Sequence, residues 1–324
     1  MFIINNLDRL ENEDDFSYKL RLCLAKINKD IDLDWAEIVE LLNIDVSADH
    51  LRKTAYGLKE YYDYLHKPNG KVRILSISDL HVPYQLDYKL LKDYKDVDIL
   101  QINGDICDCQ AISKFPKAYR VSSMQEIIMT RQYLIELINY IRPKKTILTY
   151  GNHDIRFQNY FANKLADSDL LELNPLTSIE LIVDDGFNWY DKKNGTKTHY
   201  DGIKWIDEIN SEVNYVNNWY CQIGDTIFCH PKAFKSGIMK TAETAMNFFR
   251  NEGYQFKTLV MAHTHRSGQY TIGNTTLYEQ GCFCDTKKNN YTDGQLFNSQ
   301  KEGFLYLEQD LDGNTINSKL VVLN

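Results

Sequence analysis

Several features that would assign this chain to a class of protein are missing from its sequence. No hydrophobic run approaches the roughly 20 residues that a membrane-spanning helix needs, so we expect no membrane association. The start holds only Phe2-Ile3-Ile4 as an apolar run before it turns acidic, which is not the pattern of a signal peptide. There is no internal repeat and no low-complexity segment. We therefore expect a globular cytoplasmic protein.

The chain also lacks an excess of positive charge. Its formal net charge is -8 at pH 7. A negative total disfavours non-specific binding of the whole surface to nucleic acid or to an anionic membrane. A locally basic site is still compatible with this total.

The seven cysteines show no disulfide or zinc-finger framework. Their number is odd, and the pairs Cys107/Cys109 and Cys282/Cys284 have C-x-C rather than C-x-x-C spacing. We interpret them as reduced thiols of a cytoplasmic protein.

Residues 1–66 have the hydrophobic periodicity of a separate helical module. Apolar residues recur at helical spacing in three stretches, the third of them capped by Ser47. The second and third stretches are joined by the four-residue turn 43–46 and resemble a helix-turn-helix. However, the first 69 residues hold nine Lys/Arg against fourteen Asp/Glu, whereas DNA-binding domains carry a basic face. DNA binding and packing or partner binding both stay open for this module.

A turn-forming stretch at 67–71 marks the boundary to a second domain, which runs over 67–324. Apolar, β-branched segments follow at 72–78, 97–103 and 146–149, with helical patterns between them. This alternation predicts an α/β domain with parallel strands, whose chemistry gathers at the carboxyl ends of the strands. We expect residues 155–215, rich in turns and aromatics, to form an insertion or lid over that edge.

Polar side chains follow each of these strands and two later strand-like segments. They are Asp79, His81, Asp105, Asn152, His153, His230, His263 and His265. Five of the eight histidines of the chain are in this set, which packing alone rarely produces. Mixed imidazole and carboxylate ligands suit Zn, Fe or Mn. Two metals about 3.5–4 Å apart stabilise both the attacking and the leaving oxygen of a phosphoryl displacement, with an aspartate able to bridge them. The residue types therefore predict a binuclear metal site.

The chain resembles the calcineurin-like metallophosphoesterases over about residues 72–270. The resemblance is carried by five segments in the family's order: Asp79-x-His81, Gly104-Asp105-x-x-Asp108, Gly151-Asn152-His153-Asp154, His230 and His263-x-His265. It implies an αββα sandwich, two β-sheets flanked by helices, here preceded by a small all-α domain. It also implies two divalent metal ions, with Mn²⁺ expected first and Fe, Zn or Ni as alternatives.

The same resemblance implies a ligand set for the two ions. The first ion would be held by Asp79, His81 and His265, the second by Asn152, His230 and His263, and both by Asp105. A hydroxide that bridges the ions would attack phosphorus in line. Ala262 and Pro231 stand where the family usually has glycine.

Catalytic roles follow from the resemblance as well. His153 would protonate the leaving oxygen or stabilise its charge. Asp108 falls where some members have an aspartate that orients this histidine, and Asp154 is the rival for that role. Cys109 replaces an arginine with which protein-phosphatase members grip a phosphomonoester, which argues against a phosphatase of that type. Arg156 would contact phosphate instead, or form a surface salt bridge.

Lysines after His230 offer a local positive charge. Lys232, Lys235 and Lys240 would make the mouth of the site basic, or would form an ordinary solvated face.

We expect a phosphodiesterase or nuclease acting on a phosphoester such as a nucleic acid or nucleotide. A phosphomonoesterase on a nucleotide or phosphoprotein is the alternative, and a DNA- or partner-binding protein acting through residues 1–66 is a further one.

Overall fold

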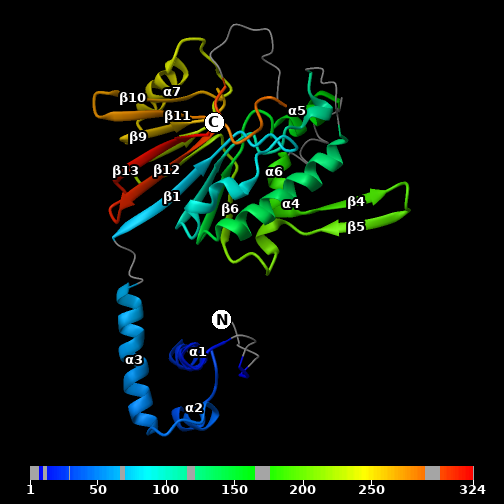
Figure 1. Cartoon of the computed structure of the whole chain (residues 1–324). Coiled ribbons are helices and arrows are strands. Elements are labelled where there is room, and N and C mark those ends of the chain that lie inside the picture. Colours follow the sequence, from blue (N-terminus) through cyan, green and yellow to red (C-terminus); the bar gives the residue numbers. More distant parts are fainter. Residues whose placement is uncertain are drawn as a thin grey trace. The chain divides into compact units, whose positions relative to one another are not determined.

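The computed structural model of the chain divides into two compact units, Met1–Gly70 and Lys71–Asn324, and each is considered by itself (Figure 1). The structure describes residues 7–9, 13–28, 30–65, 70–114, 121–164, 176–288 and 300–323. The apolar run at 2–4 and most of the turn at 67–71 lie outside the described residues.

The first unit contains the three expected helices. They are α1 Asp15–Asn28, α2 Trp35–Leu42 and α3 Ala48–Leu65. Their shared core consists of Leu22, Cys23, Ile38, Leu51 and Ala55. The Ser47 hydroxyl accepts a hydrogen bond from the N–H of His50 at 3.2 Å, so Ser47 caps α3 as predicted. Arg52 and Lys53, the basic residues early in α3, both pair with Asp49 at 2.8 and 2.7 Å. That pairing weakens the positive field that DNA binding would use, and the helix-turn-helix function stays a prediction.

The second unit is a mixed α/β domain. Its α-helices are α4 Ser123–Ile141, α5 Arg156–Lys164, α6 Ser178–Glu180 and α7 Lys240–Asn251. It also contains the short 3₁₀-helices η1 Tyr88–Tyr94, η2 Gln110–Ile112 and η5 Ile203–Trp205 and the short π-helix η4 Leu181–Asp185. Its strands are β1 Lys71–Ile77, β2 Ile99–Asn103, β3 Lys145–Thr149, β4 Phe187–Asp191, β5 Thr196–Tyr200, β6 Glu212–Val216, β7 Tyr220–Ile223, β8 Thr226–Cys229, β9 Thr258–Met261, β10 Ser267–Ile272, β11 Thr275–Gln280, β12 Gly303–Asp310 and β13 Thr315–Val322.

Two sheets organise this unit. One has the order β13-β12-β1-β2-β3-β6, in which β1, β2, β3 and β6 are parallel. The other has the order β10-β11-β9-β8-β7, in which β8, β9 and β11 are parallel. The parallel pairing of the first three strands confirms the architecture expected from the alternating pattern.

The hydrophobic clusters show how the layers stack. Ile74 of β1 and Leu305 of β12 pack with Phe228 of β8 and Val260 of β9, so one core lies between the two sheets. A second core joins α4 to the outer face of the first sheet, and a third joins α7 to the second sheet. The order of layers is helix, sheet, sheet, helix, which confirms the predicted αββα sandwich (Figure 1).

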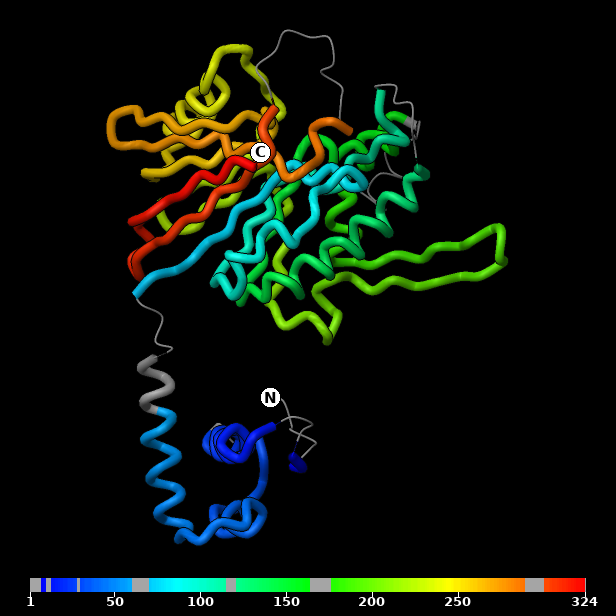
Figure 2. Tube along the Cα trace, in the orientation of Figure 1, coloured from blue at the N-terminus to red at the C-terminus, as the bar shows by residue number. Residues whose placement is uncertain are grey.

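The segment 155–215 is not one insertion. Its last part, β6, pairs in parallel with β3 and forms an edge of the first sheet. Before it, β4 and β5 form a separate two-stranded hairpin that projects from the domain (Figure 2). A lid function for this segment stays a prediction.

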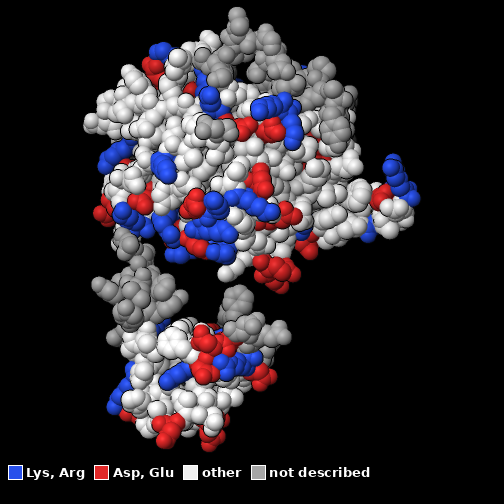
Figure 3. Space-filling model, in the orientation of Figure 1, with Lys and Arg blue, Asp and Glu red and all other residues white. Residues whose placement is uncertain are grey.

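The surface is charged but mixed. Acidic and basic side chains are interspersed over the face of both units that Figure 3 shows. Within the described ranges, no helix combines the length and the apolar character needed to cross a bilayer.

Candidate active site

The predicted site residues lie at the carboxyl ends of strands from both sheets. Residues of the first sheet follow β1, β2 and β3, and residues of the second follow β8 and β9: Asp79, His81, Asp105, Asn152, His153, His230, His263 and His265. Parallel strands end at a common edge, so a sandwich of two such sheets places both sets of loops together.

The first cluster at this edge consists of Asp79, His81 and His265, whose ligand atoms lie within 4.8 Å of one another. Nε2 of His81 is 3.0 Å from Nε2 of His265, which is itself 3.2 Å from Oδ1 of Asp79. Nδ1 of His81 is 3.1 Å from a carboxylate oxygen of Asp108. That contact fixes the ring and leaves Nε2 for a metal, since a metal-binding histidine commonly donates its other ring N–H to a carboxylate.

The second cluster consists of Asp105, His230 and His263. Nε2 of His230 lies 3.2 Å from Oδ2 of Asp105, while its Nδ1 donates to the carbonyl oxygen of Asn103 at 2.9 Å. Oδ1 of Asn152 is buried and has no hydrogen-bond partner among the described residues. Buried polar atoms without a partner are rare in proteins, and an amide oxygen is of a type that binds a metal.

Asp105 lies between the two clusters. Its Oδ2 is 3.2 Å from Nε2 of His230 and 3.7 Å from Nε2 of His81. Its Oδ1 accepts a hydrogen bond from the backbone N–H of His153 at 2.7 Å. A single oxygen of Asp105 therefore faces ligands of both clusters.

Charge and burial oppose each other in these clusters. Burial disfavours a charged His230, but the carboxylates of Asp105 and Asp79 outweigh it and raise the pKa of His230 to about 9. Burial and neighbouring histidines lower the pKa values of His81 and His263 to about 4. The negative charge that raises the pKa of His230 would equally attract a divalent cation. The donor set thus fits metal ions held by neutral imidazoles and carboxylates.

The backbone at this edge is held in an unusual conformation. Five of the predicted metal ligands have φ between 46° and 80°: Asp79, His81, Asp105, His263 and His265. Non-glycine residues seldom adopt the left-handed region, which costs about 1–3 kcal/mol each, and such residues cluster at functional sites. Gly151 allows a close approach here, because a Cβ at this position would collide with the backbone and carboxylate of Asp105.

His153 is placed by Asp108 and Arg156. Its Nδ1 is 2.8 Å from a carboxylate oxygen of Asp108, and its Nε2 is 2.8 Å from Nη2 of Arg156. Arg156 also donates to the Asp108 carbonyl oxygen at 3.0 Å, so its contacts lie within the site and the alternative of a surface salt bridge is not seen among the described residues.

Asp154, the alternative to Asp108 as the aspartate that orients His153, lies elsewhere in the site. Its buried carboxylate accepts hydrogen bonds from the backbone N–H groups of Gly151, Cys107 and Ile106 at 2.8, 2.9 and 3.1 Å. Burial raises the pKa of Asp154 to about 7. The carboxylate joins the loops after β2 and β3, whereas the carboxylate of Asp108 is the one that contacts His153.

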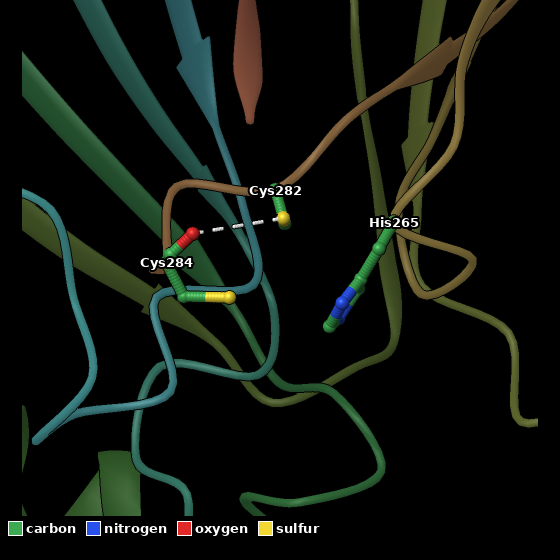
Figure 4. A group of neighbouring side chains, drawn as sticks. All are labelled: His265, Cys282 and Cys284. Carbon is green, nitrogen blue, oxygen red and sulfur yellow. Dashed lines mark hydrogen bonds between the residues drawn. The ribbon is translucent and has the colours of Figure 1, made fainter. Parts of the chain in front are cut away.

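Two cysteines that the sequence reasoning set aside lie beside the first cluster. The thiols of Cys282 and Cys284 are buried next to His265 (Figure 4). The two sulfur atoms and a ring nitrogen of His265 all lie within 4.8 Å of one another. They follow β11, which is parallel to β9 and ends at the same edge. The signal in the sequence was their position directly after a strand, and the C-x-C spacing obscured it. None of the seven cysteines, all of which lie within the described ranges, forms a disulfide bond.

A cavity of about 450 Å³ opens next to the second cluster. Its lining includes Asn152 and His230 and, after them, Lys232 and Lys235. Lys240 instead pairs with Glu243 at 2.6 Å, so of the three lysines considered it is the one on a solvated face.

Among curated proteins, none matches the chain. Solved structures that match over 78% of the chain include Vacuolar Protein Sorting 29 from Cryptosporidium parvum (14% identity, 98% of that chain, TM-score 0.36) and wild-type Vps29 complexed with Zn²⁺ from Entamoeba histolytica (11%, 99%, 0.35). An archaeal phosphodiesterase matches over the same share of the chain (13% identity, 99% of that chain, TM-score 0.31).

At these TM-scores the structural likenesses carry no argument, and the assignment depends on the family match. The family model of the calcineurin-like phosphoesterases matches residues 72–267, which span all five segments and both clusters. The chain therefore belongs to the calcineurin-like phosphoesterase family of metal-dependent phosphoesterases.

Proposed function

We propose that the chain is a phosphodiesterase or nuclease that works with two divalent metal ions, Mn²⁺ first among them. The observation that carries the proposal is the position of Asp105, whose Oδ2 faces both ligand clusters. Two ions at such a site would neutralise phosphate charge and lower the pKa of water to supply the nucleophile. The proposed ligands are Asp79, His81 and His265 for one ion and Asn152, His230 and His263 for the other, with Asp105 shared.

His153 is the proposed proton donor to the leaving oxygen. Asp108 accepts from its Nδ1, which leaves Nε2 as the atom that can exchange a proton with the substrate. The Arg156 guanidinium next to Nε2 is placed to bind a phosphate oxygen when a substrate enters. General acid catalysis of this kind contributes about 10²–10⁴-fold in rate.

The residue at position 109, Cys109, favours a diester over a monoester as substrate. Cys109 is buried, with its Sγ 3.6 Å from Sγ of Cys107, and offers no positive charge to the second negative charge of a monoester. A diester carries a single negative charge and needs less compensation. Arg156 is then the nearest described guanidinium to the proposed acid.

The test is a comparison of two chromogenic esters. The full chain with Mn²⁺ should hydrolyse bis(p-nitrophenyl) phosphate faster than p-nitrophenyl phosphate, and His153→Ala should lose about 10²–10⁴-fold in kcat on the diester. Faster hydrolysis of the monoester would contradict the diesterase assignment. The matched control is His199→Ala, an exposed histidine on β5 that contacts Asn188 and Asp201.

A further inference from the structure

The cavity beside the second cluster has walls that phosphoryl chemistry alone does not require. It shares Asn152 and His230 with the proposed metal site and continues to Trp219 and Phe248. A volume of about 450 Å³ lies within the usual range of small-ligand pockets. A group that fills it would be attached directly to a phosphate held at the metal site.

One wall of the cavity is aromatic. Phe248, on α7, is 45% exposed although it is a large apolar side chain. The Trp219 ring lies 5.6 Å from Phe248 and stacks on the buried Phe249 at 5.2 Å with an interplanar angle of 28°. The aromatic wall is thus fixed from behind while Phe248 stays accessible, which is the arrangement of a stacking platform.

The lining of the cavity also has a basic part. Lys232 and Lys235 are exposed in the loop after His230, and no ion pair of either with an acidic group is seen within the described part of the chain. Both side chains therefore keep their charge available for a phosphate.

The backbone of the loop that carries these lysines is fixed by hydrogen bonds with Arg266 and Thr241. Arg266, only 6% exposed, donates hydrogen bonds to the carbonyl oxygens of Lys235, Ser236 and Gly237 at 3.0–3.3 Å. The Thr241 hydroxyl accepts from the backbone N–H of Lys235 at 3.0 Å. A loop fixed in this way loses little entropy when it binds a ligand.

We propose that this cavity binds one nucleotide unit of a single-stranded oligonucleotide, next to the scissile phosphodiester. The base stacks on the exposed Phe248 with Trp219 beside it, and the neighbouring phosphate pairs with Lys232 and Lys235. Stacking requires an unpaired base, which is why the ligand is single-stranded. This inference rests on the proposed function and narrows its substrate class.

The direct test is binding, measured by fluorescence anisotropy. A short 5′-labelled oligothymidylate is titrated onto the full-length His153→Ala protein with Mn²⁺, so that cleavage does not interfere. We expect Phe248→Ala, and separately Lys232→Ala with Lys235→Ala, to weaken binding about tenfold. The controls are Tyr190→Ala and Lys197→Ala, paired across the β4–β5 hairpin, and they should bind like the parent. Parent-like affinity of the cavity variants, or tighter binding of duplex than of single strand, would overturn the proposal.

Hydrolysis separates this inference from the function on which it rests. In the cavity variants, the ratio of kcat/KM for the oligonucleotide to kcat/KM for bis(p-nitrophenyl) phosphate should fall about tenfold. An unchanged ratio would contradict the subsite while leaving the diesterase intact. If no ester is hydrolysed, the proposed function fails, and the anisotropy still decides whether the cavity binds a nucleotide.

Discussion

Nδ1 of His153 and a carboxylate oxygen of Asp108 lie 2.8 Å apart, and the same oxygen is 3.1 Å from Nδ1 of His81. One buried carboxylate thus orients both the proposed acid and a proposed metal ligand. Each ring has its Nδ1 engaged by Asp108, while Nε2 of His81 faces His265 and Nε2 of His153 faces Arg156.

Replacement of that carboxylate should therefore damage catalysis more than folding. We expect Asp108→Asn to lower kcat on bis(p-nitrophenyl) phosphate by about 10–100-fold, because a neutral amide gives both ring N–H groups weaker hydrogen bonds than a carboxylate does. The control is Asp207→Asn at an exposed aspartate. A wild-type kcat for Asp108→Asn, with the protein folded by circular dichroism, would show that the contact has no catalytic role.

Gly151 should be required for its lack of a side chain. A Cβ there would collide with Asp105, so Gly151→Ala should displace the shared carboxylate and reduce bound metal as well as activity. The same substitution at Gly57 has no atom within 4 Å to meet, and in the middle of α3 it should stabilise the first unit by about 0.5–1 kcal/mol. Metal content by inductively coupled plasma mass spectrometry gives the answer, and full metal occupancy in Gly151→Ala would contradict it.

Metal ions should stabilise the second unit against heat. Each ion at 100 times its Kd would add about 2.7 kcal/mol, which raises the Tm of a domain of this size by roughly 5–10 °C per ion. The midpoint should fall again with chelator, as scanning calorimetry can record. In Asp105→Asn the rise of Tm on addition of metal should be much smaller. A wild-type Tm that changes with neither metal nor chelator would contradict the metal site.

The thiols beside His265 should influence which metal is bound. Sulfur ligands favour Zn²⁺ over Mn²⁺, so a protein with Cys282→Ser and Cys284→Ser should take up a larger share of Mn²⁺ from an equimolar mixture of the two ions. The comparison is made on dialysed protein by elemental analysis, with Cys23→Ser, in the core of the first unit, as the control. An unchanged ratio of the two metals would mean that the thiols only fill space.

The sequence was most informative where chemistry and strand pattern coincide. Polar residues placed directly after apolar strands predicted the common edge and the residues that meet there, whereas the αββα sandwich and the division into two ligand sets came from the resemblance to the family. The sequence was least informative for Asp108 and Asp154, which lie in the loops after β2 and β3, because only the folded backbone shows which of the two carboxylates points toward His153. The sequence did not predict β6 within the segment 155–215. The five residues Glu212–Val216 form a strand because they pair with β3, and that pairing cannot be seen in the local pattern.

The most direct test of the binuclear site is the number of metal ions bound per chain, measured together with activity. Wild-type protein dialysed against Mn²⁺ should bind two ions and cleave bis(p-nitrophenyl) phosphate. Asp105→Asn should bind fewer than two ions and lose the activity, because Oδ2 of Asp105 faces both clusters. Two ions and full activity in Asp105→Asn, or no bound ion in the wild type, would contradict the account.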